Sequence, residues 1–191
     1  MDTTAIIDAL SKALPGDPSR FEAVATGDGM PTIYVDLEHL VDTCRVLRDD
    51  PSLRFVLLLD IIAVDYLPRE PRFEVLYLLA CPGVSGFGTV PKRLRLKVRV
   101  PGTDPHLPTV STVWPAADWA EREMYDLMGV IADGHPDLRR ILMPEDWEGH
   151  PMQRNYPVQI SMKVKTYEPL QVSQEEFVAN VETARGRSRE E

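Results

Sequence analysis

The spacing of apolar residues predicts two helices in the first fifty residues. The first begins near Thr4, a candidate N-cap, and ends before Pro15 and Gly16; its apolar face consists of Ile6, Ile7, Leu10, Ala13 and Leu14. A β-prone segment follows at 32–35. The second helix ends before Pro51, and its apolar face consists of Leu37, Leu40, Val41, Cys44 and Leu47.

Strand patterns occupy the middle of the chain. The run from Phe55 to Val64 is too apolar to expose either face, so a buried strand is expected there. Across a proline-containing turn at 68–71, the alternating residues 73–79 predict its antiparallel hairpin partner. Residues 93–100 alternate basic and apolar side chains, which indicates a strand with one face on the core and the other facing solvent or a partner.

A third helix is expected from Pro115, placed as a first helical residue, to the terminating Gly129, with the apolar stripe Ala116, Ala120, Met124 and Leu127. From residue 133 to about 170, prolines recur and no sustained period appears, so this arm cannot form a core of its own. Truncation after Leu142 is therefore expected to leave the core folded but to abolish association with the partner that the arm binds. Ser173 and Glu176 are spaced like a capping box.

These elements predict an α+β fold, with helices covering a mostly antiparallel sheet and a long extended C-terminal arm. We expect a globular domain at 1–132 and a proline-interrupted, partner-binding arm at 133–172. Residues 173–191 are expected to form a short helix or a disordered tail.

Composition narrows the classes of partner. The chain has 43% hydrophobic residues and a formal net charge of -9, so nucleic acid and anionic lipid are not expected partners. The longest apolar run contains Asp60 and falls short of the roughly 20 residues that span a bilayer. The acidic N-terminus does not resemble a secretory signal, and a cytoplasmic location without a direct membrane span is expected.

Cofactor motifs are weak. Cys44 and Cys81 lie far apart and are expected to be buried; they are too few to hold an iron–sulfur cluster through four thiolates of this chain. Gly83, Gly86 and Gly88 occur in the order G-x-x-G-x-G before a strand, which favours a flexible loop over a phosphate site.

Acids and histidines near the third helix suggest two kinds of chemistry. A small hydrolase or metal enzyme would use His135 and His150 with the nearby carboxylates Asp137, Glu145 and Asp146, although the histidines lie far apart for a zinc site. General acid or base roles would fall to Glu121, Glu123 and Asp126. Because no nucleophile motif accompanies these acids, a solvated or partner-facing surface is the preferred interpretation.

Aromatic residues and arginines are dense in the same region: Trp114, Trp119, Tyr125, Trp147 and Tyr156 accompany His135, Arg139, Arg140 and Arg154. Aromatic residues and arginine are favoured as interface anchors. An extended arm with such anchors needs a protein surface to satisfy its backbone polar groups. A protein partner is therefore expected.

Read together, WAEREMYDLMGV at 119–130 and GHPDLRRILMPEDWEGHP at 134–151 resemble the C subunit of bacterial NADH:quinone oxidoreductase, respiratory complex I. The chain departs from the family pattern at Ala132, where an aromatic is common, and at MQRNYP in place of PLRKDYP. The resemblance implies a peripheral-arm subunit on the cytoplasmic side of the bacterial inner membrane, with no cofactor of its own. NADH, FMN, iron–sulfur clusters and quinone would be bound by other subunits, and the arm would bind the hydrogenase-related D subunit, which helps to form the quinone site.

The residues that carry the resemblance are assigned to partner interface and fold, and none to catalysis: Trp119, Glu121, Arg122, Glu123, Tyr125, Asp126, His135, Asp137, Arg139, Arg140, Asp146, Trp147, His150, Arg154 and Tyr156. Asp137 is expected to cap or to pair with an arginine. Either Arg139 or Arg140 is expected to present a bidentate fork to a partner carboxylate. The equivalent subunit of an energy-converting hydrogenase, or of another donor-linked quinone reductase, remains the alternative.

Overall fold

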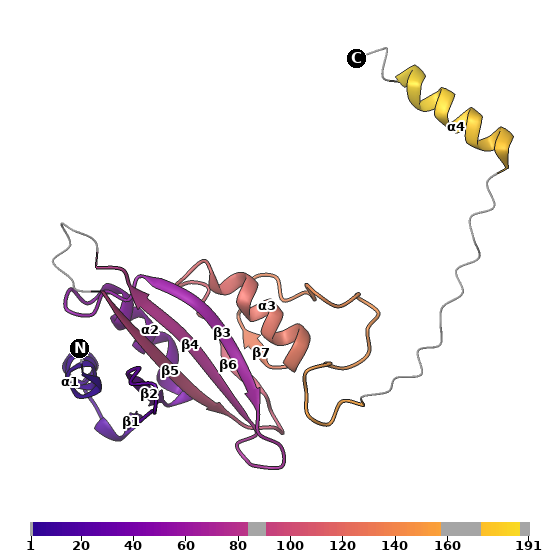
Figure 1. Ribbon diagram of the computed structural model, residues 1–191. Helices are drawn as coiled ribbons and strands as arrows, with labels where there is room; N and C mark the ends of the chain where they lie inside the picture. Colours follow the sequence, from indigo (N-terminus) through magenta and orange to yellow (C-terminus); the bar gives the residue numbers. More distant parts are fainter. Residues whose placement is uncertain (1, 84–90, 158–172, 188–191) are drawn as a thin grey trace. The chain divides into compact units, whose positions relative to one another are not determined.

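A computed structural model describes residues 2–83, 91–157 and 173–187 (Figure 1). The chain divides into two compact units, Met1–Tyr156 and Pro157–Glu191. The first unit contains a five-stranded sheet and the helices that pack on it. Within the second, the structure describes one helix, α4 (Gln174–Arg187).

The sheet has the strand order β1-β2-β5-β4-β3. Its strands are β1 (Phe21–Val24), β2 (Thr32–Val35), β3 (Leu57–Asp65), β4 (Phe73–Cys81) and β5 (Lys92–Val100). β2 runs parallel to β5, whereas the other neighbouring pairs are antiparallel. A separate parallel pair joins β6 (His106–Pro108) to β7 (Ile131–Asp133). The predicted α+β fold with a mostly antiparallel sheet is confirmed. The short strands β1, β6 and β7, of three or four residues, were not predicted.

The predicted helices are present with shifted starts. They are α1 (Thr3–Ala13), α2 (Leu40–Asp49), which follows a 3-10 turn at Leu37–His39, and α3 (Ala117–Met128). A second 3-10 turn spans Pro18–Arg20. Asp2, and not Thr4, caps α1 by accepting a hydrogen bond from the Thr3 N–H at 2.7 Å. α3 begins two residues after Pro115, so that proline lies in the preceding turn.

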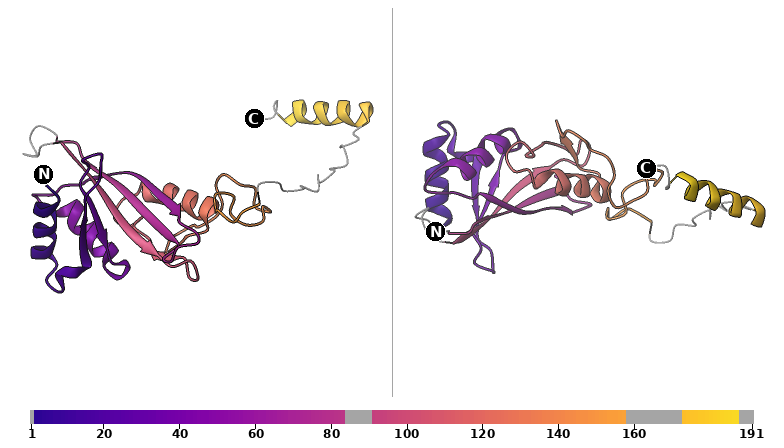
Figure 2. Two further views of the ribbon diagram at one scale, coloured as in Figure 1. Left: turned by 60° about the horizontal axis from the view of Figure 1, so that its bottom comes forward. Right: turned by 90° about the horizontal axis from the view of Figure 1, so that it is seen from above.

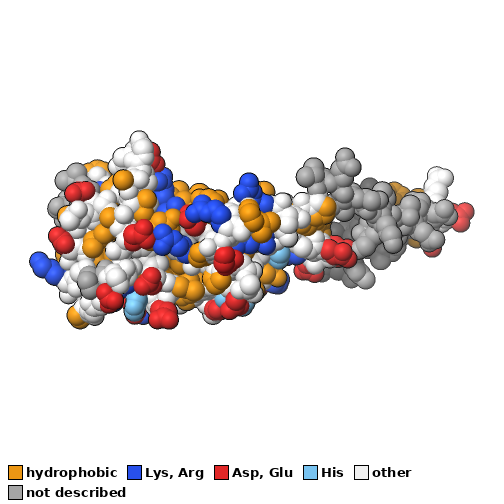
Figure 3. Space-filling model, turned by 90° about the horizontal axis from the view of Figure 1, so that it is seen from below, with side chains coloured by type: hydrophobic (Ala, Val, Ile, Leu, Met, Phe, Trp, Pro, Cys, Tyr) orange, Lys and Arg blue, Asp and Glu red, His pale blue; other side chains and the backbone are white. Residues whose placement is uncertain are grey.

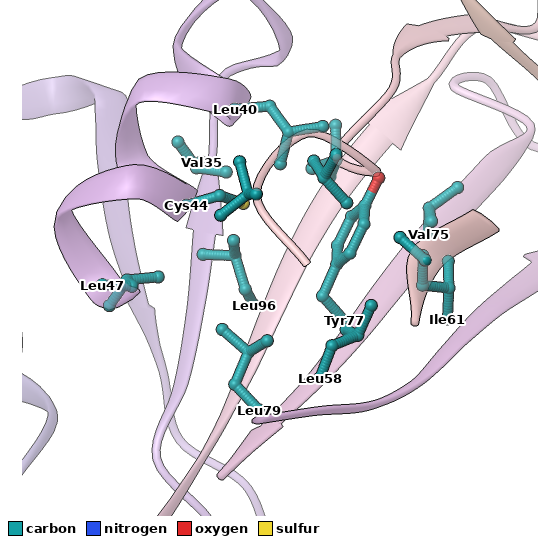
Figure 4. Close-up of a cluster of buried hydrophobic side chains, with 14 of the residues drawn as sticks. Val35, Leu40, Cys44, Leu47, Leu58, Ile61, Val75, Tyr77, Leu79 and Leu96 are labelled. Atoms are coloured by element: carbon teal, nitrogen blue, oxygen red, sulfur yellow. The ribbon is translucent and has the colours of Figure 1, made fainter. Parts of the chain in front are cut away.

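The core lies between one face of the sheet and the helices. α2 and α3 cover the same face (Figure 2), and Leu40, Cys44 and Leu47 of α2 pack toward Tyr77 and Leu96 of the sheet (Figure 4). Cys44 and Cys81 are free and buried, as predicted. The described helices include none with the length and apolarity that a bilayer crossing requires.

The basic side chains of β5 lie on the opposite face of the sheet and pair with acids of the same chain. Arg95 lies 2.7 Å from Asp28, and Lys97 lies 2.6 Å from Glu74. Arg99 pairs with Glu22 at 3.0 Å. Basic and acidic side chains lie side by side in the space-filling view (Figure 3). Much of this positive charge is therefore compensated within the chain.

The prediction that the apolar run at 55–64 is fully buried was wrong. β3 forms one edge of the sheet, with β4 as its neighbour, and it contains both buried and exposed side chains. Exposed apolar side chains in and beside this strand are Val56, Leu57, Leu59 and Ile62. An uninterrupted apolar run is typical of a central strand, but sequence pattern does not reveal whether another layer covers the outer face.

The segment at 134–151, the second of the two that resemble the family, is part of the first unit. Residues 133–156 pack with the sheet domain, although the sequence assigned them to a separate arm. The rest of that arm, at 158–172, lies outside the described residues, as do the glycine-loop residues 84–90 and the end of the tail at 188–191. The Ser173–Glu176 capping box is present: the Ser173 hydroxyl accepts from the Glu176 N–H, and the Glu176 carboxylate accepts from the Ser173 N–H, each at 3.2 Å.

Candidate functional site

Two buried acids of α3 organise the region that carries the family resemblance. The side chain of Asp126 is fully buried, and its carboxylate accepts hydrogen bonds from the N–H groups of residues 141, 142 and 143 at 3.0, 2.7 and 2.8 Å. Arg140 donates to the same carboxylate at 2.7 Å. Burial opposes ionisation, but the Met143 N–H, the Arg140 guanidinium and the remaining N–H groups outweigh it, so the pKa of Asp126 is lowered.

The Arg140 guanidinium extends this connection away from α3. Its second terminal nitrogen donates to the carbonyl oxygens of Trp147 at 3.0 Å and Gly149 at 2.9 Å. The side chain is only 14% exposed. One arginine therefore joins the helix to a turn of the 134–156 segment, and its fork is used within the chain instead of being offered to a partner carboxylate.

The C-terminal end of α3 is closed by the same segment. The final carbonyls of a helix lack partners within it. Here the carbonyl oxygens of residues 126, 127 and 128 accept in turn from His150 Nδ1 at 3.0 Å, Met152 N at 2.9 Å and Gln153 Nε2 at 2.7 Å. Gly129, with φ of 74°, ends the helix, and a Cβ there would lie 2.5 Å from His150 Cδ2. A glycine is required both by the backbone conformation and by this close approach.

Glu121 is the second buried acid. Its side chain is fully buried and accepts hydrogen bonds from the Thr109 hydroxyl at 2.5 Å and from the Val110 N–H at 2.7 Å. Burial raises the pKa of Glu121. The carboxyl group fastens the loop at 109–110 to α3, so this acid supports the fold and does not lie on a solvated face.

His135 connects the 134–156 segment to the first turn of α3. Its Nδ1 accepts from the Asp137 N–H at 3.0 Å, so the ring proton lies on Nε2. Nε2 lies 3.0 Å from both the carbonyl and the carboxylate oxygen of Asp118, and 4.0 Å from Glu121. Across residues 2–83, 91–157 and 173–187, no group of three or more His, Cys, Asp or Glu side chains is placed to hold a metal ion.

A third buried carboxylate, which the sequence analysis did not single out, holds the end of the segment. Asp65, at the end of β3, accepts two hydrogen bonds from Arg72 at 2.9 and 2.6 Å, one from Leu67 N at 2.9 Å and one from Arg154 N at 2.8 Å. Arg72 also donates to the Asn155 side chain at 2.7 Å. The Arg72 guanidinium is the main cause that lowers the pKa of Asp65 to about 2. The sequence signal for this buried carboxylate was the position of Asp65 directly after the apolar run at 55–64.

Low pH should lower the free energy of unfolding, because it protonates Asp65. Its pKa of about 2 in the folded chain lies below the ordinary 3.8, so this stabilisation is present above pH 4 and is lost as the pH falls toward 2. The difference corresponds to about 2 kcal/mol. Denaturant unfolding at pH 6 and pH 2.5 should show a smaller loss for Asp65→Asn than for the unmodified chain. Equal losses in the two proteins would contradict this role, and Asp36→Asn, at an exposed position, is the control.

Several signature residues stay at the surface. The side chains of Trp119, Leu142 and Met152 are 62%, 55% and 63% exposed. The Arg122 guanidinium lies 5.2 Å from the centre of the Trp119 ring, and it donates to the carbonyl of Arg139 at 3.1 Å. The indole therefore has a defined cationic neighbour while most of its surface remains open.

Of the remaining residues that carry the resemblance, some are held by contacts within the chain and others are exposed. Asp137 pairs with Arg139 through two hydrogen bonds of 2.7 Å, which confirms the expected pairing with an arginine. Tyr125 meets His150 edge to face at 5.6 Å, Tyr156 donates to the Glu148 carbonyl at 3.0 Å, and Trp147 is half-buried. Exposed members are Glu123, Arg139, Asp146 and Arg154.

A known protein family matches the part of the chain that contains these residues. The model of the family described as "Respiratory-chain NADH dehydrogenase, 30 Kd subunit" matches residues 33–161, which include all three buried carboxylates. The chain belongs to this family.

Curated relatives carry the corresponding name. The NADH-quinone oxidoreductase C subunit of Roseiflexus sp. (strain RS-1) is 45% identical over 158 residues, which cover 83% of this chain and 86% of that protein. The C subunit of Salinispora tropica is 44% identical over 154 residues, or 80% of this chain. The match spans 60% of the length of the Salinispora tropica protein.

Solved structures share the fold. The trypsin-resistant fragment (1-134) of Nqo5 is 31% identical, with a TM-score of 0.59, over 72% of this chain and 100% of that fragment. A chain in the structure of the membrane-bound sulfane sulfur reductase, an archaeal respiratory membrane complex, has a TM-score of 0.67 at 22% identity. That match covers 90% of this chain and 96% of the other, and it concerns the fold alone.

Proposed function

We propose that this chain is a non-catalytic structural subunit of the peripheral arm of a proton-translocating NADH:quinone oxidoreductase. It supports electron transfer from NADH to quinone by binding the hydrogenase-related D subunit, on the cytoplasmic side of the bacterial inner membrane. NADH, FMN, iron–sulfur clusters and quinone are bound by other subunits. The observation that carries the proposal is the exposed Trp119 on a helix whose surroundings are held by buried charges.

The backbone around the exposed Trp119 is held rigidly, which favours binding of a partner. Trp119 projects from α3, while Leu142 and Met152 project from a segment whose backbone is bound directly to α3. Because the Asp126 and Arg140 contacts already order that backbone, docking costs little further conformational entropy. Exposed tryptophan beside arginine is the composition typical of interface hot spots. We call Trp119, Leu142 and Met152 the anchor surface.

The test is the affinity of the purified full chain for the purified D subunit. Trp119→Asp should weaken binding by about 30-fold or more, as loss of an interface hot spot does. The free energy of unfolding of the isolated chain should change little because the indole is 62% exposed. Thr112→Asp, in an exposed turn before α3, is the matched control and should bind normally. Unchanged affinity for Trp119→Asp would reject the anchor surface.

The alternative is the equivalent subunit of an energy-converting hydrogenase or of another donor-linked quinone reductase. It is favoured by the fold shared with a chain of the archaeal sulfane sulfur reductase complex. The subunits that co-purify with the chain separate the two. A flavin-bearing NADH dehydrogenase module supports the main proposal, whereas a hydrogenase-type set without that module supports the alternative.

A further inference from the structure

The edge strand β3 presents apolar side chains on the side of the sheet away from the helices. Leu57 and Ile62 are 46% and 39% exposed, and Leu59 is 54% exposed. Their neighbours Leu58 and Ile61 are both buried in the core, because the register shift between Leu58 and Asp60 inserts one extra residue into the strand. Beside them on β4, Leu78 is opposite Asp60 and Leu76 is opposite Ile62. We call Leu57, Leu59, Asp60 and Ile62 the β3 surface.

This surface is separate from the anchor surface. α3, which carries Trp119, packs on the core face of the sheet (Figure 2). The register and burial of β3 place Leu57 and Ile62 on the other face. Apolar side chains as exposed as Leu59, gathered on a single edge strand, are typical of an interaction site. The β3 surface and α3 therefore lie on opposite faces of the sheet.

The local geometry opposes the addition of another β-strand. The register of β3 with β4 shifts between Leu58 and Asp60, which is a bulge. The Ile61 N–H donates at 2.8 Å to the side chain of Asp60, so a backbone donor of the strand is already engaged. Bulges and charged side chains are the devices by which edge strands avoid pairing. A partner must consequently pack against side chains.

Asp60 specifies the chemistry of that partner. Its exposed carboxylate lies among Leu57, Leu59 and Ile62, and the Ile61 N–H engages one of its oxygens. Covering the apolar side chains would also remove water from this carboxylate, which is costly unless a cation faces it. A second copy of the chain would place Asp60 near its equivalent across a twofold axis, between molecules of net charge -9. The charge pattern favours a different protein.

We propose that the β3 surface docks a neighbouring subunit of the complex through an apolar patch that contains an arginine or lysine facing Asp60. The proposal rests on the proposed function, because it requires the chain to be part of an assembly. It adds a second contact that the anchor surface does not provide. The side chains of the partner meet Leu57, Leu59 and Ile62, while its cation replaces water at the carboxylate.

Carbodiimide-driven amidation of carboxyl groups, read by mass spectrometry, tests this in the purified complex and in the isolated full chain. Labelling of Asp60 should fall by about tenfold in the complex, because the carboxylate is paired and shielded from water. The exposed carboxylates of Asp8 and Asp36 serve as references within the same sample. Equal labelling of Asp60 in the two states would overturn the proposal.

Two substitutions then test the cation. Asp60→Asn retains an oxygen for the Ile61 N–H, whereas Asp60→Arg opposes the partner cation, so recovery of the chain in the complex should fall more for arginine than for asparagine. Equal recovery of the two variants would overturn the proposal that a cation of the partner faces Asp60. A chain that enters no complex refutes the proposed function, whereas a chain that assembles with Asp60 still reactive refutes the β3 surface alone.

Discussion

Asp126→Ala is expected to lower the free energy of unfolding by about 3–5 kcal/mol, the loss typical of breaking a buried ion pair from one side. The substitution leaves the Arg140 guanidinium without its carboxylate. It also leaves three N–H groups, those of residues 141–143, without their acceptor. Because all of these donors lie in partly buried surroundings, water restores their hydrogen bonds only incompletely.

Denaturant unfolding of the full chain measures this loss. Asp137→Ala is the matched control, because it also removes a carboxylate paired with an arginine, but Arg139 is 71% exposed and Asp137 43%. Surface pairs of this kind contribute little, so the control should unfold almost as the unmodified chain does. Similar destabilisation by the two substitutions would show that Asp126 does not organise the fold.

The second large effect is expected from the position of a C-terminal truncation. A chain ending at Met143 loses the acceptors of Arg140 at Trp147 and Gly149. It also loses the groups at 150–153 that close α3. With several hydrogen bonds lost at about 1 kcal/mol each, the melting temperature should fall by about 10 °C or more.

A chain ending at Pro157 is the control for this truncation, because it retains the whole first compact unit. It should melt close to the full chain in a thermal scan followed by circular dichroism. The sequence analysis expected the core to stay folded after truncation at Leu142. The contacts of Trp147 with Arg140 and of Arg154 with Asp65 instead predict that the chain must reach the end of the first unit. If the chain ending at Met143 melted normally, the bonds that close α3 would contribute little to stability.

The division between buried and exposed signature residues was not predictable from the sequence. Glu121 and Asp126 are charged residues on an amphipathic helix, and such residues usually face solvent. They are buried because donors from elsewhere in the chain meet them, at 109–110 for Glu121 and at 140–143 for Asp126. No local pattern announces those donors, since they come from loops that become neighbours only after folding.

By itself, the sequence determined the local elements that have a strong period or strong punctuation. The alternation of β5, the apolar stripe of α2, the glycine after α3 and the Ser173 capping box all act through neighbouring residues, so they can be recognised before the chain folds. The family resemblance could be recognised for the same reason, because it is a continuous string of residues.

Only the tertiary structure decided which residues meet across long separations. Asp65 accepts a hydrogen bond from the Arg154 N–H far along the chain, and the apolar run of β3 became an exposed edge. Strand order and burial depend on how the whole chain closes around its core, and residue type alone does not encode them. For this reason residues 133–156, first interpreted as part of an arm in need of a partner, belong to the first compact unit, while Leu142 and Met152 within them stay exposed.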